Sequence, residues 1–383
     1  RIMQTRENPE TLDEMHTAIV STMNGLIAEL ATGAGIDCAR IYEVTVAGNT
    51  TMQHLFCKIT PAALGEVPFP PAFNRGLFLK SDSLGLNIHP RGSLYVFPNI
   101  GGFVGGDTVA GILAATLYLA DKPLLLVDIG TNGEIILAHD GQLLATSTAA
   151  GPAFEGARIT EGMRAADGAI EKVVMEDDDL SYNVIGNTQP AGICGTALID
   201  LTAELLRLGV IDETGRVLAP EELPPTVPPA IKARLIQQDG QTNVEIVPAD
   251  QSKTGKSICL YQRDIRELQL ASGAIRAGIM IILRKAGLDV NDIHEVLLAG
   301  AFGNFIRRKN ARRIGLLPNL PTSKIRFIGN AASMGAKAVL LSKDIRAIAD
   351  KTAAKAVHVD LSADPEFQME FAMAMMFPGM ETD

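Results

Sequence analysis

Residues 124–129 read LLLVDI, a short apolar run in which Asp128 is the only charged side chain. A run of four to eight apolar residues is typical of a strand that is covered on both faces of its sheet. A glycine-rich turn follows at 130–133, and the stretches at 134–138 and 142–147 continue as further strands. The spacing therefore predicts a strand, a tight turn and a hairpin of two more strands, with helices on both sides of the sheet.

The rest of the chain alternates between helical and extended patterns. Apolar residues at helical spacing predict helices at 9–30, 108–119, 196–208 and 267–286. Short apolar runs predict strands at 41–47, 94–97, 295–298 and 325–328. Proline, glycine and acidic residues predict loops at 59–92, 176–190 and 212–230. This alternation indicates an α/β architecture with helices packed against a mixed sheet.

Composition excludes several classes of function. The chain of 383 residues has 34 Lys and Arg against 44 Asp and Glu, a formal charge of −10, which argues against a protein that binds nucleic acid over its whole surface. No apolar run approaches the roughly 18 residues that span a bilayer, so we expect no membrane segment.

The four cysteines show no metal-ligand spacing and are expected to be reduced thiols of a cytoplasmic protein. The chain opens at Arg1, and we expect it to begin inside a longer protein.

Asp128 and the turn that follows it are the first candidate site. A carboxylate at the end of a buried strand is costly unless it is paired, hydrogen-bonded or bound to a cation. Gly130 and Gly133 allow backbone N–H groups to face phosphate oxygens, and Thr131 and Asn132 add donors. Mg²⁺ is commonly bound by a carboxylate together with waters and phosphates. The residues alone leave a second interpretation open, a β-hairpin closed by an Asx-type turn.

The second candidate is the segment LLAGAFGN at 297–304, where small residues sit at a strand-to-helix turn. Such a turn allows a phosphate or a flat ligand to approach the backbone, although it also suits close packing of a helix on a strand. A basic cluster follows, which is either a solvated helix face or an attractor of phosphate or of an acidic partner: Arg307, Arg308, Lys309, Arg312 and Arg313.

The sequence SKTGKS at 252–257 resembles part of the phosphate-binding P-loop motif. The P-loop motif requires a glycine at position 250, which is Asp250 here, and the residues that follow resemble a strand rather than a helix. We therefore expect an exposed hairpin turn at this place.

The motifs DIGTNGE and LLAGAFGN together resemble the phosphate and adenosine motifs of the actin–hexokinase–heat-shock (ASKHA) ATPase superfamily. Further segments resemble the ATPase region of reductive activators of corrinoid proteins, and the resemblance extends over residues 41–378. These segments are VAGNTTMQHL (46–55), VGGDTVAGILA (104–114), GPAFEGARITEGMRAADGAIEKV (151–173), GICGTALIDL (192–201) and QRDIRELQLASGAIRAGI (262–279).

This resemblance implies a two-lobed α/β fold with ribonuclease-H-like lobes, of which the first is incomplete in this chain. Residues 1–122 would be the remainder of the first lobe, 123–345 the second lobe, and 346–383 a Met- and Phe-rich tail packed on the core. The motif DIGTNGE would be the second phosphate loop. The first phosphate loop and a [2Fe–2S] domain are expected upstream of Arg1, so the chain alone should not transfer electrons.

The activity that the resemblance implies is ATP hydrolysis that helps return an inactive Co(II) corrinoid to Co(I), so that corrinoid-dependent methyl transfer resumes. The expected cofactors are ATP and Mg²⁺. The expected partner is a corrinoid protein or a corrinoid-dependent methyltransferase component, with no nucleic acid and no membrane, and a homodimer is compatible with the family. The alternatives are a small-molecule kinase on the same scaffold, for which Asp107 is the candidate catalytic residue, and a non-catalytic module that binds nucleotide and a partner.

The family roles can be carried over by position. Asp128 would hold Mg²⁺, directly or through water, or orient the attacking water. The terminal phosphates would meet Gly130, Thr131, Asn132 and Gly133. The adenosine would be bordered by Gly300, Ala301, Phe302, Gly303 and Asn304. Gly106 and Asp107 would lie at the helix that connects the lobes.

Overall fold

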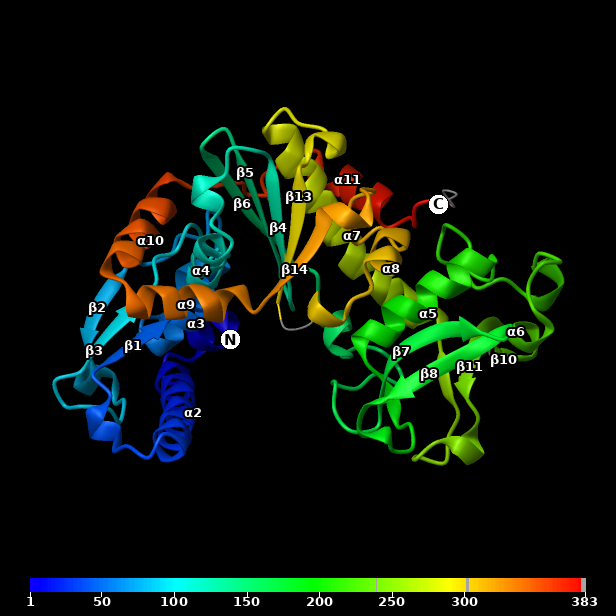
Figure 1. Ribbon diagram of the computed structural model, residues 1–383, viewed down its shortest axis with the longest axis horizontal. Coiled ribbons are helices and arrows are strands. Elements are labelled where there is room, and N and C mark those ends of the chain that lie inside the picture. The colour runs from blue at the N-terminus through cyan, green and yellow to red at the C-terminus, as the bar shows by residue number, and fades with distance from the viewer. Residues whose placement is uncertain (239, 301–302, 380–383) are drawn as a thin grey trace. The chain divides into compact units, whose positions relative to one another are not determined.

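The computed structural model describes residues 1–238, 240–300 and 303–379 (Figure 1). Within these ranges the chain divides into two compact units. Unit 1 contains 1–126, 136–147 and 328–359, and unit 2 contains 127–135, 148–327 and the chain from residue 360 onward. Each unit is described by itself.

A six-stranded sheet carries the first candidate motif. Its strand order is β14-β13-β4-β5-β6-β15, so that β4 lies at the centre. The strands are β4 (Leu124–Ile129), β5 (Gly133–His139), β6 (Gln142–Thr148), β13 (Glu295–Ala299), β14 (Ile325–Gly329) and β15 (Val357–His358). The hairpin predicted from the apolar run and its glycine turn is confirmed, as are the strands expected near 295 and 325. Central strands are covered on both faces, which explains why β4 and β13 are almost entirely apolar.

Two smaller sheets and five α-helices belong to the described part of unit 2. The sheets have the orders β8-β7-β9 and β10-β11-β12. Their strands are β7 (Ala169–Glu176), β8 (Asp179–Val184), β9 (Gly192–Ile193), β10 (Leu235–Gln238), β11 (Gln241–Val247) and β12 (Ile258–Leu260). The helices are α5 (Gly195–Leu208), α6 (Pro229–Ala233), α7 (Gln262–Lys285), α8 (Arg308–Arg313) and α11 (Phe367–Ala374).

The sequence interpretation is wrong at 176–190, where β8 pairs with β7 as an antiparallel hairpin. It is correct at 252–257, which lies in the connection between the antiparallel strands β11 and β12. The sequence SKTGKS is therefore a turn and does not open a helix, as a P-loop would.

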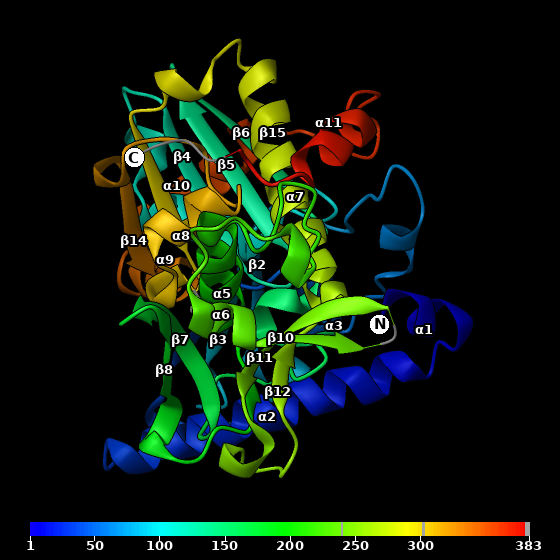
Figure 2. The ribbon, with the colours of Figure 1, turned by 90° about the vertical axis from the view of Figure 1, so that its right-hand side faces the viewer.

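The long helix α7 is the main packing element of unit 2. Its first turn is closed by Asp264, whose Oδ2 accepts a hydrogen bond from the Tyr261 N–H at 3.1 Å. Arg284 and Lys285 lie in its last turn, where cations are favoured by the helix dipole. Arg284 forms ion pairs with two glutamates of the C-terminal segment, and Lys285 contacts Asp364 at 3.0 Å. Helix α11 consequently packs along α7 (Figure 2).

Unit 1 contains a three-stranded sheet of order β1-β3-β2, in which β1 and β3 are parallel and β2 is antiparallel. Its strands are β1 (Glu43–Val46), β2 (Leu77–Lys80) and β3 (Ser93–Val96). Its helices are α1 (Ile2–Glu7), α2 (Thr11–Gly33), α3 (Thr50–Phe56), α4 (Gly106–Ala114), α9 (Ala331–Leu341) and α10 (Lys343–Lys355). Helix α9 packs against α4, and its Ala336 carbonyl accepts a hydrogen bond from Thr45 of β1 at 3.0 Å.

The loop expected at 59–92 is interrupted by β2, which is an edge strand with alternating exposure. All four cysteines are free thiols. In the described part of the chain, no helix combines the length and apolar character needed to cross a membrane.

Candidate functional site

The turn between β4 and β5 is tightly closed. The Gly130 N–H donates a hydrogen bond to the Asn132 carbonyl at 3.0 Å. Gly133 faces Ile275 of α7 and Thr148 of β6. A Cβ at position 133 would lie 2.7 Å from Ile275 Cγ1 and 2.9 Å from Thr148 Oγ1. Close packing therefore requires glycine at 133. The same addition at Gly130 would meet only the Asn132 carbonyl, at 3.6 Å.

The structure brings the two sequence motifs together at the ends of neighbouring strands. Asp128, half-buried in β4, lies against Gly300, which follows β13. A Cβ on Gly300 would lie 2.8 Å from Asp128 Oδ1 and 2.7 Å from the Ile129 carbonyl, and Gly300 has φ of +95°. Only glycine fits this backbone conformation and this close approach. A carboxylate and a glycine turn from distant parts of the sequence thus lie side by side.

Beyond Gly300, the chain forms the short 3₁₀ turn η10 (Gly303–Phe305). The Gly303 N–H donates a hydrogen bond to the Gly300 carbonyl at 3.2 Å, which keeps the turn close to the end of β13. Ala301 and Phe302, both expected to border adenosine, lie outside the described residues, and of Asn304 only the backbone is described.

Thr131 is held by a segment that we did not predict as part of the site. Its carbonyl accepts a hydrogen bond from the Gly151 N–H at 2.9 Å, and its hydroxyl donates one to Glu155 Oε1. Glu155 ends the short 3₁₀ turn η5 (Pro152–Glu155) and is exposed. The sequence resemblance includes this segment, but no local pattern distinguishes Glu155 from other surface carboxylates.

A pocket of about 330 Å³ lies beside these elements in unit 2. It is lined by Phe154, Glu155, Arg164, Ala165, Glu171, Ile185, Cys194, Gly195, Thr196 and Phe305. Glu155 connects the pocket to Thr131 of the turn, and Phe305 connects it to the segment that follows β13. The volume falls at the lower end of the range for small-molecule pockets, and the mixture of aromatic, aliphatic and few polar groups is typical of them.

The first turn of α5 forms one wall of this pocket. Cys194 precedes the helix and is only 4% exposed, and its Sγ lies 3.1 Å from Thr196 Oγ1. The Thr196 hydroxyl donates a hydrogen bond to the Glu171 carbonyl at 2.6 Å, so this wall is fixed to β7. Hydrogen bonds within the protein therefore hold this wall of the pocket in place.

The basic cluster after η10 has a structural role at its first member. Arg307 Nε donates a hydrogen bond to Asp200 Oδ1 at 2.9 Å, and Asn310 Nδ2 donates to the same oxygen at 2.7 Å. Burial raises the pKa of the Asp200 carboxyl, although both hydrogen bonds favour its charged form. Arg308 is bonded to the carbonyls of Thr322 and Ile325. Arg307 is therefore a structural cation that pairs with a buried carboxylate, whereas Arg308 is exposed at the start of α8.

Gly106 and Asp107 begin α4 in unit 1. The Gly106 N–H donates a hydrogen bond to Gln53 Oε1 at 3.2 Å, and the Asp107 N–H donates one to the Gly48 carbonyl at 3.1 Å. The Asp107 carboxylate accepts from the Thr108 N–H at 2.8 Å. Burial raises the pKa of Asp107, so its neutral form is favoured more than in water.

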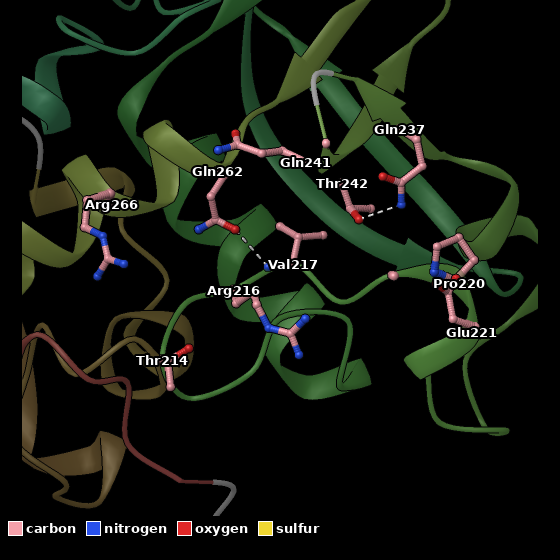
Figure 3. Close-up of a pocket in the computed structure, with 12 residues that line it drawn as sticks. Thr214, Arg216, Val217, Pro220, Glu221, Gln237, Gln241, Thr242, Gln262 and Arg266 are labelled. Atoms are coloured by element: carbon pink, nitrogen blue, oxygen red, sulfur yellow. Dashed lines mark hydrogen bonds between the residues drawn. The ribbon is translucent and has the colours of Figure 1, made fainter.

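A larger cavity of about 720 Å³ in unit 2 lies between the 214–221 segment, the β10–β11 hairpin and the start of α7 (Figure 3). Several of its polar residues already have hydrogen-bond or ion-pair partners within the protein. Gln262 Oε1 accepts a hydrogen bond from the Val217 N–H at 3.0 Å, and Arg216 is paired with Glu222 and Asp212. None of the predicted site residues lines this cavity.

Comparison with known proteins adds independent findings. A family model described as the C-terminal domain of RACo, the ASKHA domain, matches residues 122–383, and a model described as the RACo middle region matches residues 1–120. These matches and the solved structure described next confirm the expected α/β fold class.

Three proteins illustrate the similarity. The corrinoid activation enzyme RamQ of Eubacterium limosum is 38% identical over 377 residues, which cover 98% of this chain and 63% of that protein. The [Co(II) methylated amine-specific corrinoid protein] reductase of Methanosarcina barkeri is 27% identical, over 89% of this chain and 63% of that protein. A solved structure of a reductive activator for corrinoid, iron-sulfur protein superposes with a TM-score of 0.87 at 35% identity, covering 100% of this chain and 60% of the other. The chain spans less than two thirds of the length of each.

Proposed function

The chain belongs to the RACo family of reductive activators of corrinoid proteins, and from this premise we propose that it is the ATP-binding and ATP-hydrolysing region of such an activator. The observation that carries the proposal is the contact between Gly300 and the Asp128 carboxylate, which unites the expected phosphate and adenosine motifs. The names of the relatives favour corrinoid activation over the alternative of a small-molecule kinase.

In this proposal the triphosphate lies along the turn at 130–133. A Cβ at Gly130 would meet only the Asn132 carbonyl, at the ordinary contact distance of 3.6 Å, so the backbone is not crowded there and a phosphate oxygen can approach it. The nucleoside occupies the pocket of about 330 Å³, which is lined by Phe305, the residue that follows the expected adenosine motif. Phosphoryl transfer depends on positioning and on charge stabilisation more than on a reactive side chain, which suits a site built from backbone and one carboxylate.

Asp128 fits a magnesium ion. Its carboxylate is half-buried at the end of a strand beside the turn, and Mg²⁺ is typically bound by one or two carboxylates, with waters and phosphates completing its coordination. When bound, the metal would neutralise charge on the phosphates. Asp128 would hold it, directly or through water, or orient the attacking water. The Gly300 contact restricts where the carboxylate can move.

The partner in this proposal is a corrinoid protein or a corrinoid-dependent methyltransferase component. Hydrolysis of ATP would drive the unfavourable reduction of its Co(II) to Co(I), with the electron supplied by a [2Fe–2S] domain of the longer polypeptide. The printed names of the relatives support the corrinoid partner. Assembly into a homodimer is a prediction that oligomeric-state measurements would test.

The division into lobes is also a proposal. Residues 1–122 would belong to the first lobe, 123–345 to the second, and 346–383 to a tail. The family models change between residues 120 and 122, which supports the first boundary. In the tail, residues 346–355 belong to α10, whereas α11 packs on α7 within unit 2.

The direct test uses the polypeptide that contains this chain together with a Co(II) corrinoid protein and a low-potential reductant. Ultraviolet–visible spectra would follow the loss of Co(II) and the formation of Co(I) with ATP, without ATP, and with a non-hydrolysable analogue. We expect reduction only with ATP. Equal reduction without nucleotide, or none with ATP while RamQ activates the same corrinoid protein, would contradict the proposal.

A further inference from the structure

The hydrogen bond between Thr131 and Glu155 limits what the threonine hydroxyl can do. A hydroxyl has one hydrogen, and here it is donated to the Glu155 carboxylate. A phosphate oxygen needs a donor, so Thr131 cannot serve it through this hydrogen while the bond persists. The remaining lone pairs of the Thr131 oxygen can accept a hydrogen bond from water or contact a cation.

Glu155 also places a second carboxylate near the turn that follows Asp128. Asp128 precedes this turn in the sequence, and Glu155 contacts its first side chain, Thr131. The other charged residues that line the pocket are Arg164 and Glu171, so the lining carries one more negative than positive charge. Along the turn, where Glu155 contacts Thr131, a free nucleoside triphosphate, close to a tetra-anion, would be repelled more than its magnesium complex, which carries two fewer negative charges.

We propose that Glu155 makes this site select the magnesium complex of the nucleotide over the free triphosphate. The negative charge of Glu155 disfavours binding of the metal-free anion. Because Glu155 accepts the hydrogen of the Thr131 hydroxyl, the lone pairs of the threonine oxygen remain to accept a hydrogen bond from water of the metal's hydration shell. This inference rests on the proposed nucleotide site. It assigns a role to a residue that sequence reasoning did not identify.

The size of the effect follows from the charges. An exposed carboxylate several ångströms from the phosphates interacts weakly with each of their charges, because water screens it, and the two forms of the nucleotide differ by two charges. One carboxylate should therefore change the relative affinity for the two forms by about tenfold, a factor that corresponds to 1.4 kcal/mol at 25 °C. The effect should weaken at high ionic strength, because Glu155 is exposed.

The experiment measures nucleotide binding by isothermal titration calorimetry with the polypeptide that contains this chain. The dissociation constant of ATP is determined in EDTA and in excess Mg²⁺, and the ratio of the two values is the readout. Glu155→Gln removes the charge but keeps an acceptor for Thr131. Glu176→Gln, at the exposed end of β7 and outside the pocket lining, is the matched control.

We expect Glu155→Gln to lower the ratio about tenfold, mainly through tighter binding of metal-free ATP. The control and Thr131→Ser should keep the ratio of the unaltered protein. Thr131→Val keeps the Glu155 charge but loses the hydroxyl, and it should weaken only the binding of the magnesium complex. If Glu155→Gln does not fold, the binding of the two nucleotide forms to Thr131→Val tests the inference instead.

A ratio for Glu155→Gln within twofold of the unaltered protein would overturn the inference while nucleotide binding itself remains. Equal weakening of both nucleotide forms by Thr131→Val would also overturn it. Failure of the unaltered protein to bind ATP in either condition is a different result, because it would refute the proposed function and this inference with it.

Discussion

Replacement of Gly300 by alanine tests the geometry that joins the two motifs. The new Cβ would lie 2.7 Å from the Ile129 carbonyl and 2.8 Å from Asp128 Oδ1, at a φ of +95° that side chains rarely adopt. The backbone strain costs about 1–2 kcal/mol, and the crowding of well-packed atoms adds about 1–3 kcal/mol. We therefore expect a loss of about 3 kcal/mol, which lowers the melting temperature by about 6–12 °C if the matched ASKHA region unfolds as one domain.

The assay is thermal unfolding followed by circular dichroism, together with ATP titration at a temperature at which the variant is folded. Gly303→Ala is the matched control, because its Cβ would meet only carbon atoms at 3.7 Å or more. We expect Gly303→Ala to unfold within about 2 °C of the unaltered protein, as do most substitutions without a steric cause. If Gly300→Ala unfolds with the control and binds ATP normally, the close approach of Gly300 to Asp128 is refuted.

Three further predictions follow from buried polar groups. Burial lowers the pKa of His54, whose Nε2 accepts a hydrogen bond from the Ala72 N–H. The contribution of His54 to stability is therefore present above pH 6.5 and is lost as the pH falls below that value. Urea unfolding at pH 7.5 and 5.5 should show this loss of stability, and the His54→Gln variant should lack it. Arg307→Ala removes the cation from buried Asp200 and should lower the free energy of unfolding by about 3–5 kcal/mol. A decrease of less than about 1 kcal/mol, measured by denaturant unfolding, would contradict a stabilising role of this ion pair. Burial raises the pKa of the Cys57 thiol to about 12, which lowers its thiolate fraction at pH 8 about a thousandfold. A thiolate of higher pKa is more nucleophilic, so alkylation should be slower than in the unfolded chain by somewhat less, about a hundredfold, and equal rates by mass spectrometry would exclude this burial.

Local patterns predicted the elements that carry the site. The strand at 124–129 has the bounds of β4, because a buried central strand requires a continuous apolar run. The loop interpretation failed at 176–190, where the acidic run at 176–179 obscured a strand pattern. Residues 179–184 read DLSYNV and alternate polar with apolar side chains, as a half-buried strand does, and they form β8 as the antiparallel partner of β7. Strand β2 was also missed, and it pairs with β3 at the edge of its sheet.

The two motifs of the site were recognised in the sequence, but their contact depends on strand order. Adjacent positions of β4 and β13 place Gly300 against Asp128, and no single-sequence pattern gives that order. Glu155 was missed because its partner Thr131 is distant along the chain. Arg307 was interpreted among surface cations because its buried partner Asp200 lies far away in the sequence.

In the proposed function, Asp128 acts on magnesium-bound ATP. Steady-state hydrolysis of MgATP by the polypeptide that contains this chain, compared with hydrolysis by its Asp128→Ala variant, tests this role, with thermal unfolding as the control for folding. We expect hydrolysis to fall about a hundredfold or more while the melting temperature changes little. Hydrolysis at the unaltered rate in a folded Asp128→Ala variant would refute the role of Asp128.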